Sequence, residues 1–117
     1  AGFIQTGCGT ITQPGAWHQE IAEWTPHQKA SFFMEAWRSE HATYTAQNAI
    51  EEKSPELVQL LKIKREVLER SRIPIRIYAG IVDAGGKPDA ELEQEVIGCI
   101  RKLQMQTLST LSKENGS

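Results

Sequence analysis

The segment that begins at Thr25 constrains the fold more than any other part of the chain. Thr25 suits a helix N-cap, Pro26 suits the first helical position and Gln28 completes a capping box, so a helix is predicted to begin here. At about 100° per residue, its apolar residues fall on two opposite faces. One face carries Ala30, Phe33, Met34, Trp37, His41 and Tyr44, and the other carries Phe32, Ala36, Thr43, Ala46 and Ile50.

A helix with two apolar faces is difficult for a short chain to cover. The chain has 117 residues, and a single domain of this size buries only about two-thirds of the surface that it exposes when unfolded. We therefore predict that one face packs on the protein's own core and the other binds a partner protein. The predicted partner-binding residues are Phe32, Phe33, Trp37, His41, Tyr44 and Ile50.

Two further helices are predicted downstream, and a short one upstream. Ser54 and Pro55 repeat the cap-and-proline signal, which ends the first long helix near Lys53 and opens another that runs to about Arg72. Asp89 caps a last helix. A short helix over residues 16–24 presents Trp17, Ile21 and Trp24 on one face. The predicted inward residues of the last helix are Leu92, Val96, Cys99, Ile100 and Leu103.

From Ile73 the apolar residues recur at every second position as far as Ile81, which predicts that residues 73–82 form a strand with one apolar side. Pro74 suits an edge strand, and residues 84–87 form a turn. The predicted fold is mainly α, with three or four helices in a hairpin or bundle and one short β-strand. That strand pairs with the N-terminal arm or with another chain. We expect one domain over residues 1–117, with an extended arm (1–15) and a frayed tail (112–117).

Composition excludes several classes of partner. Charged residues form 24% of the chain and the net charge is -2, so no cluster of Lys and Arg points to nucleic acid. No apolar stretch approaches the roughly 20 residues needed to span a bilayer. Cys8 and Cys99 are expected to be reduced thiols, and the first residues do not resemble a secretory signal. We expect a cytoplasmic protein that binds neither nucleic acid nor membrane.

Candidate chemical groups are scattered. Cys8 lies between two glycines, which favour a turn over a phosphate loop, and His18 is its nearest imidazole in sequence. His27 and His41 do not stand at a metal-ligand spacing with any other histidine. Asp83 fits a turn as well as an acid or base. We predict no catalytic residue, no metal ligand and no cofactor, and keep a small enzyme using Cys8, His18 or Asp83 as a minor alternative.

The order of residues in two stretches resembles a known family. Ala16-Trp17, Ile21-Ala22, Lys29-Ala30 and then Trp37-Arg38-Ser39-Glu40-His41, followed by Thr43, are similar to the start of the gamma subunit of soluble methane monooxygenase-type di-iron hydroxylases. Ile73-Pro74-Ile75, leading to Asp83 and a glycine, is similar to a later part. The resemblance implies a non-catalytic helical subunit that packs against a larger chain holding the iron and contributes no metal ligand itself.

The predicted function is therefore a non-catalytic accessory subunit or protein-interaction module, with the small subunit of a multicomponent di-iron monooxygenase as its most specific form. The alternative is a homo-oligomeric regulatory or adaptor protein that binds another protein, with the predicted strand pairing across a two-fold axis. The two interpretations differ in what they predict for the isolated chain: the alternative expects a stable homodimer, and the accessory subunit is expected to aggregate or unfold without its partner.

Overall fold

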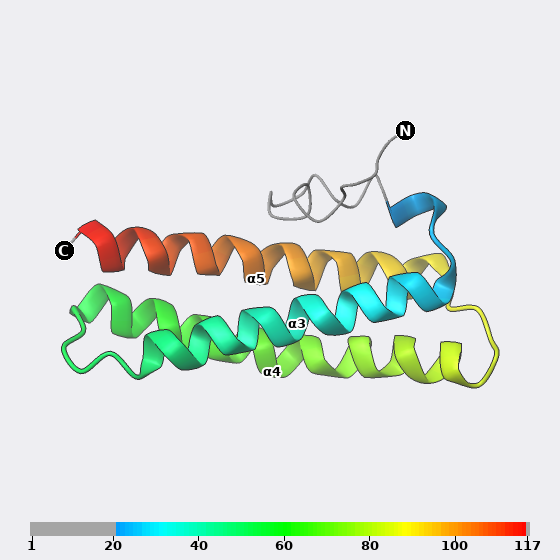
Figure 1. The fold of residues 1–117 in the computed structure, drawn as a ribbon, viewed down its shortest axis with the longest axis horizontal. Helices are drawn as coiled ribbons and strands as arrows, with labels where there is room; N and C mark the ends of the chain where they lie inside the picture. Colours follow the sequence, from blue (N-terminus) through cyan, green and yellow to red (C-terminus); the bar gives the residue numbers. More distant parts are fainter. Residues whose placement is uncertain (1–20, 117) are drawn as a thin grey trace.

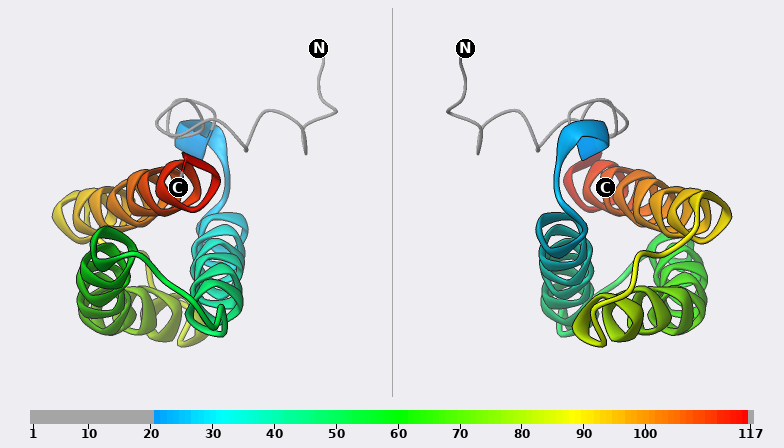
Figure 2. Two further views of the ribbon diagram at one scale, coloured as in Figure 1. Left: turned by 90° about the vertical axis from the view of Figure 1, so that its left-hand side faces the viewer. Right: turned by 90° about the vertical axis from the view of Figure 1, so that its right-hand side faces the viewer.

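The computed structural model describes the backbone of residues 21–116 and the side chains of residues 21–111. Within this range a short 3-10 helix, η1 (Ile21–Glu23), precedes three long helices, α3 (Pro26–Asn48), α4 (Pro55–Asp83) and α5 (Ala90–Gly116). The long helices lie side by side, and α4 runs antiparallel to both α3 and α5 (Figure 1). Seen end-on, they form a triangle around a shared core (Figure 2). The prediction of a mainly helical bundle is confirmed.

The starts of the three long helices lie where local signals predict them. Thr25 and Gln28 form a reciprocal capping box, in which the Thr25 N–H donates to Gln28 Oε1 at 2.9 Å and the Gln28 N–H donates to Thr25 Oγ1 at 3.2 Å. Ser54 Oγ accepts from the Leu57 N–H, and Asp89 Oδ1 accepts from the Leu92 N–H. Each cap satisfies a backbone donor that has no partner inside its helix.

Residues 73–82 do not form the predicted strand. They are the last turns of α4, and no strand occurs in the described part of the chain. Burial of one apolar side chain stabilises the bundle by roughly 1.5–3 kcal/mol. Several such side chains are buried in these turns, and their combined contribution outweighs the roughly 3 kcal/mol that a proline costs inside a helix. Ile73 and Ile77, which would lie on the apolar side of the predicted strand, are exposed. The buried residues of these turns are Pro74, Ile75, Tyr78 and Val82.

The end of α4 is set by a glycine in the left-handed region. Gly85 has φ 86°, and its N–H donates to the Val82 carbonyl at 2.9 Å. The Gly86 N–H donates to the Ile81 carbonyl at 2.8 Å. This pair of bonds is a Schellman motif, which satisfies two carbonyls at the helix end. The predicted turn at residues 84–87 is therefore the C-terminal cap of α4 and leads into α5.

The core is built from all three long helices and η1. Ile21 is 1% exposed, so η1 is anchored in the bundle. Phe33 is fully buried and meets the Tyr78 ring edge-on, with 5.2 Å between the ring centroids. Edge-to-face aromatic pairs of this kind add about 0.5–1.5 kcal/mol to the burial of the rings. The buried cluster comprises Ile21, Ala30, Phe33, Val67, Leu68, Ile75, Tyr78, Val82, Val96, Ile97, Ile100 and Leu103.

The two apolar faces of α3 are covered by different parts of the same chain. On one face the Trp37 indole N–H donates to the Leu68 carbonyl of α4 at 2.9 Å. On the other, Phe32 packs edge-on against Trp24, with ring centroids 5.6 Å apart. Both side chains are partly buried against the core. The two-faced helix therefore does not by itself require a second protein, because a helix in a three-helix bundle has two helical neighbours.

Several predictions fall outside the described residues. The N-terminal arm (1–15), its strand-like segment, Cys8, Trp17 and His18 all lie there. The residues from Ser112, predicted to fray, belong to the backbone of α5 as far as Gly116. No helix in the described range is long and apolar enough to cross a membrane.

Candidate functional site

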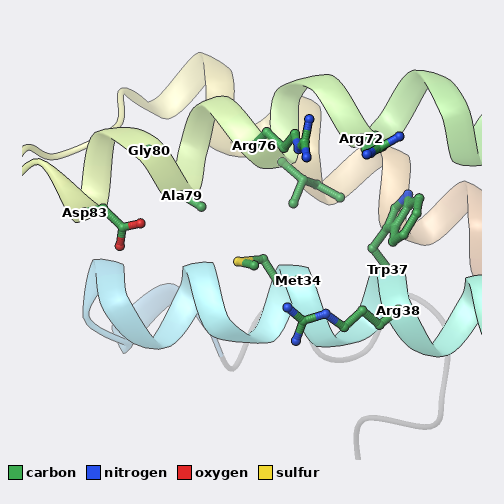
Figure 3. Close-up of a pocket in the computed structure, with 9 residues that line it drawn as sticks. Met34, Trp37, Arg38, Arg72, Arg76, Ala79, Gly80 and Asp83 are labelled. Carbon is green, nitrogen blue, oxygen red and sulfur yellow. The ribbon is translucent and has the colours of Figure 1, made fainter.

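A solvent-open groove of about 530 Å³ lies between α3 and α4 (Figure 3). Its volume falls in the range of about 300–1,000 Å³ that is typical of ligand-binding pockets. In the close-up, Met34 faces Ala79 across the groove, and Trp37 lies beside Arg72. The residues that line the groove are Met34, Trp37 and Arg38 of α3, and Arg72, Ile75, Arg76, Ala79, Gly80 and Asp83 of α4.

A row of three aromatic rings extends this groove along α3. Trp37 and His41 stack with ring centroids 5.1 Å apart and an angle of 16° between the planes, and Tyr44 follows at 6.4 Å from His41. A smaller hollow of about 200 Å³ lies over the row and shares Trp37 and Arg72 with the first. We call the two together the α3–α4 groove. Its second part is also lined by His41, Tyr44, Arg65, Leu68 and Glu69.

The charge of the α3–α4 groove is mainly positive. Arg38 pairs with Glu35 at 3.3 Å and Arg65 pairs with Glu69 at 3.2 Å, but all four side chains are more than half exposed. Exposed ion pairs of this kind contribute little to the stability of the fold, and their charges remain available to a ligand. Arg72 and Arg76 make no ion pair with any residue between 21 and 111. The groove therefore presents guanidinium groups next to an aromatic surface.

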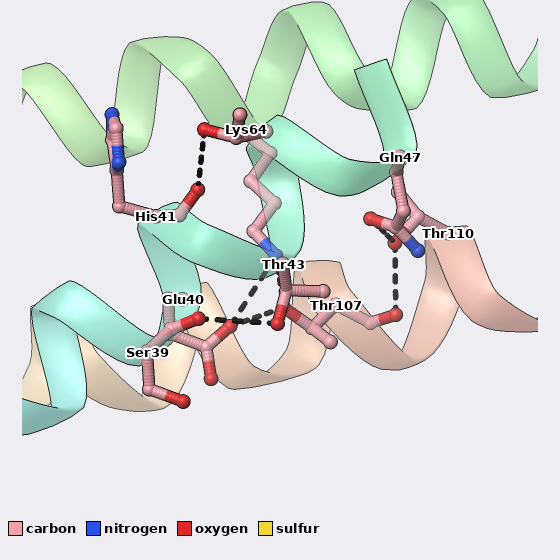
Figure 4. A network of polar contacts seen from close by, with 9 residues as sticks. Ser39, Glu40, His41, Thr43, Gln47, Lys64, Thr107 and Thr110 are labelled. Carbon is pink, nitrogen blue, oxygen red and sulfur yellow. Dashed lines mark hydrogen bonds and ion pairs between the residues drawn. The ribbon is translucent and has the colours of Figure 1, made fainter. Parts of the chain in front are cut away.

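A second polar feature lies inside the bundle. Lys64 of α4 is fully buried, and its Nζ lies 3.3 Å from Glu40 Oε1 of α3 and donates to Thr107 of α5 (Figure 4). Thr107 in turn donates to Glu40. Burial lowers the pKa of Lys64 from its ordinary value of 10.5, although the charge and hydrogen bond of Glu40 oppose the shift. The network joins all three long helices and is mostly buried, with the Glu40 side chain 13% exposed, which favours a structural role.

A similar arrangement lies nearer the other end of the bundle. Lys29 Nζ donates to both oxygens of Glu93, at 3.1 and 3.0 Å, and the Tyr78 hydroxyl donates to Glu93 Oε1 at 2.9 Å. Burial raises the pKa of Tyr78 above its ordinary value of 10.0, and the neighbouring carboxylate raises it further. Because the Glu93 carboxylate is satisfied by two partners, this cluster also serves the packing of α3, α4 and α5.

The predicted partner-binding residues separate into two groups. Phe33 is 0% exposed and belongs to the core, so it cannot contact a partner directly. Phe32 is partly buried between Trp24 and Phe33, and Ile50 is partly buried in the loop after α3. The other three residues lie together in the α3–α4 groove: Trp37, His41 and Tyr44.

The other candidate residues that the structure describes do not assemble a reactive site, and Cys8 and His18 lie outside the described range. Asp83 is exposed at one end of the groove, and His27 is exposed in the first turn of α3. Burial raises the pKa of the Cys99 thiol, which disfavours the thiolate needed for nucleophilic attack. Within residues 21–111 no three His, Cys, Asp or Glu side chains are grouped as they would be to hold a metal ion.

The sequence alone does not bring Arg72 and Arg76 together. Its patterns predict Arg72 at the end of a helix and Arg76 in a strand. In a continuous helix the two stand four residues apart and share one face. That spacing was the available signal, and Pro74 between them obscured it.

Comparisons of the chain with known protein families, characterised proteins and solved structures give no match. The function is therefore argued from the geometry of the chain's own residues.

Proposed function

We propose that the chain is a non-catalytic helical protein-interaction module that binds a larger protein through the α3–α4 groove. One observation carries the proposal: an open groove combines the stacked rings of Trp37 and His41 with Arg72 and Arg76, which have no ionic partner among the described residues. Trp, Tyr and Arg are the residues most enriched at the energetic centres of protein interfaces.

Purification from the native source, followed by site-specific photo-crosslinking, tests this proposal. A photoreactive phenylalanine analogue replaces Ala79 in the groove, and a matched variant carries it at Arg101, which is exposed on α5. We expect one co-purifying protein to crosslink from position 79 and not from position 101. Crosslinking of the co-purifying protein from position 101 alone would place the interface elsewhere.

A binding measurement with the identified protein completes the test. Trp37→Ala should weaken binding by at least about 2 kcal/mol if Trp37 anchors the interface. Val58→Ala is the control, because Val58 is also a partly exposed apolar residue of the bundle, at 52%, but does not line the groove. Equal affinity of both variants and the unaltered chain would remove the groove from the interface.

The more specific form of the proposal is the small subunit of a multicomponent di-iron monooxygenase. The resemblance to the gamma subunit includes Trp37, Arg38 and His41, and all three line the α3–α4 groove. In that case the groove would receive the large iron-holding chain. Iron analysis of the complex purified from the native source tests this form, and a partner without iron would contradict it. The proposed location is the cytoplasm, supported by Cys99, a free thiol.

A second candidate function is a homo-oligomeric regulator, and the exposed isoleucines of α4 favour it. Ile73 is 64% exposed and Ile77 is 50% exposed, one helical turn apart. A two-fold contact between two copies of α4 would cover both residues. Sedimentation of the purified chain separates the two candidates: a dimer that Ile77→Lys dissociates supports the regulator, and a monomer supports the module.

A further inference from the structure

The sign of the charge in the α3–α4 groove differs from that of the whole chain. The net charge of the protein is -2, yet three arginines (Arg38, Arg72 and Arg76) line the main part of the groove, against a single carboxylate, Asp83. Arg38 approaches from α3 and the other two from α4, so the positive charge lies on both walls (Figure 3). A positive patch of this kind favours partners that carry a negative patch, and it increases the rate at which they associate.

The spacing of the charges fits a helix better than an extended chain. Arg72 and Arg76 are one helical turn apart, about 6 Å along the axis of α4. Two carboxylates at positions i and i+4 of a partner helix repeat this spacing when that helix lies along the groove. In an extended strand, residues that share a face recur at about 7 Å and every second residue points away. A helix therefore presents consecutive carboxylates to both arginines while keeping its apolar side chains on the adjacent stripe.

The floor and wall of the groove leave room for an apolar side chain. Met34, Ile75 and Ala79 provide apolar surface, and a Cβ added at Gly80 would meet nothing within 4 Å. A leucine or phenylalanine from a partner can therefore enter beside the Trp37 ring. The combination of an apolar anchor with flanking ion pairs is the arrangement by which amphipathic helices bind grooves.

Asp83 determines the direction of the partner helix. It lies seven residues beyond Arg76, about 10 Å further along α4, and in the close-up it stands at the end of the groove away from Trp37. A helix carries partial positive charge at its N-terminus. In the favourable orientation the N-terminus of the partner helix lies at Asp83, and its acidic turns lie beside Arg76 and Arg72. The partner helix then runs antiparallel to α4.

Building on the proposed function, we propose that the α3–α4 groove binds an acidic amphipathic helix of the partner protein, antiparallel to α4, with carboxylates on Arg72 and Arg76 and an apolar side chain beside Trp37 and Met34. Nucleic acid fits the groove less well. Sequence-independent binding of phosphates needs many basic contacts along a surface, and the two charges that lack a partner span a single helical turn.

Fluorescence anisotropy with labelled synthetic peptides tests this inference. The acidic probe is an amphipathic peptide of about 16 residues, roughly 24 Å of helix, with Glu at i and i+4 and Leu and Phe on the adjacent stripe. A second peptide carries Lys at every Glu position, a third has the acidic composition in scrambled order, and the fourth probe is a single-stranded DNA of matched length. Titrations are made at about 50 and 200 mM salt, because ion pairs at an open groove weaken with ionic strength.

We expect the acidic amphipathic peptide alone to bind, and its affinity to fall with salt. The double variant Arg72→Glu/Arg76→Glu should weaken it about tenfold or more, because it places like charges opposite each other. Arg70→Glu is the matched control, since Arg70 is exposed on the same helix but does not line the groove. Circular dichroism is used to check that both variants keep the helical fold.

Four results would overturn the inference: no binding of the acidic peptide, equal binding of the basic or scrambled peptide, tighter binding of the DNA, or an affinity that the double variant leaves unchanged. Failure of the inference is distinguishable from failure of the proposed function. If the natural partner still crosslinks from position 79 while the double variant binds it as tightly as the unaltered chain does, the groove is the interface but its partner is not an acidic helix.

Discussion

The pairing of Lys64 with Glu40 places two charges inside the bundle, where each depends on the other. Lys64 is 0% exposed and the Glu40 side chain is 13% exposed. Removing ions of this kind from water costs several kcal/mol each, and only their mutual attraction and hydrogen bonds offset that cost. The pair is therefore expected to define how α3, α4 and α5 are aligned more than to add net stability.

Breaking this pair should be far more harmful than replacing it. Glu40→Ala leaves the Lys64 charge buried without its carboxylate and should lower the free energy of unfolding by about 3–5 kcal/mol. The triple variant Glu40→Leu/Lys64→Met/Thr107→Val removes every member of the network and should recover most of that loss. Urea denaturation followed by circular dichroism measures both.

Glu35→Ala is the matched control for this prediction. Glu35 lies on the same helix and forms an exposed pair with Arg38, so its removal should cost less than about 1 kcal/mol. A loss for Glu40→Ala no larger than that of the control would show that the buried lysine is satisfied without its partner.

Tyr78 should make the fold sensitive to alkaline pH. Burial first, and then the Glu93 carboxylate, raises its pKa above 10.0 in the folded chain. Above about pH 10 the unfolded chain loses the phenolic proton and the folded chain keeps it, so the free energy of unfolding falls as the pH rises. This contribution is complete below pH 10 and is lost at a rate of at most about 1.4 kcal/mol per pH unit.

Denaturation of the unaltered chain and of Tyr78→Phe between about pH 8 and 11 isolates this effect. The variant lacks the phenolic proton, so its stability should decline less steeply above pH 10, although other groups titrate in both proteins. Parallel declines in the two proteins would contradict the assignment.

At the scale of the helices, starts were predictable and the identity of residues 73–82 was not. The caps at Thr25, Ser54 and Asp89 depend on hydrogen bonds within three residues, which a sequence displays directly. The continuation of α4 through Pro74 depends on burial against the rest of the bundle, which no local window contains. The same error hid the shared face of Arg72 and Arg76, so the α3–α4 groove could only be found in the folded chain.

The end of α4 offers a test in which two glycines respond with opposite sign. Gly85 has φ 86°, so Gly85→Ala forces a Cβ into the left-handed region and should destabilise the chain by about 1–2 kcal/mol. Gly98 lies inside α5, where an added Cβ meets nothing within 4 Å, so Gly98→Ala should stabilise it by about 0.5–1 kcal/mol. Thermal unfolding measures both, and a shift of the same sign for the two variants would refute the Schellman cap as the cause.

At the scale of the whole molecule, the arrangement of three helices resolves the problem that α3 posed. A helix with two apolar faces suggests a missing partner when it is considered alone, but in a three-helix bundle it meets two neighbours at different angles. Trp37 bonds to α4, while Lys29 and Glu40 on the other flank reach α5. The periodicity of a sequence shows which faces are apolar but does not show how many neighbours will cover them.

This arrangement predicts that the isolated chain is a folded monomer. Within the described range, a single cluster of buried residues spans η1 and the three long helices. Cooperative unfolding is expected when one core is shared by all the helices of a small domain. Analytical ultracentrifugation at micromolar concentration should give a mass near 13.1 kDa, and thermal unfolding should show one transition that does not depend on concentration. An aggregated or unfolded chain would instead show that the core requires a companion, and a dimer that Ile77→Lys dissociates would transfer the function to the exposed face of α4.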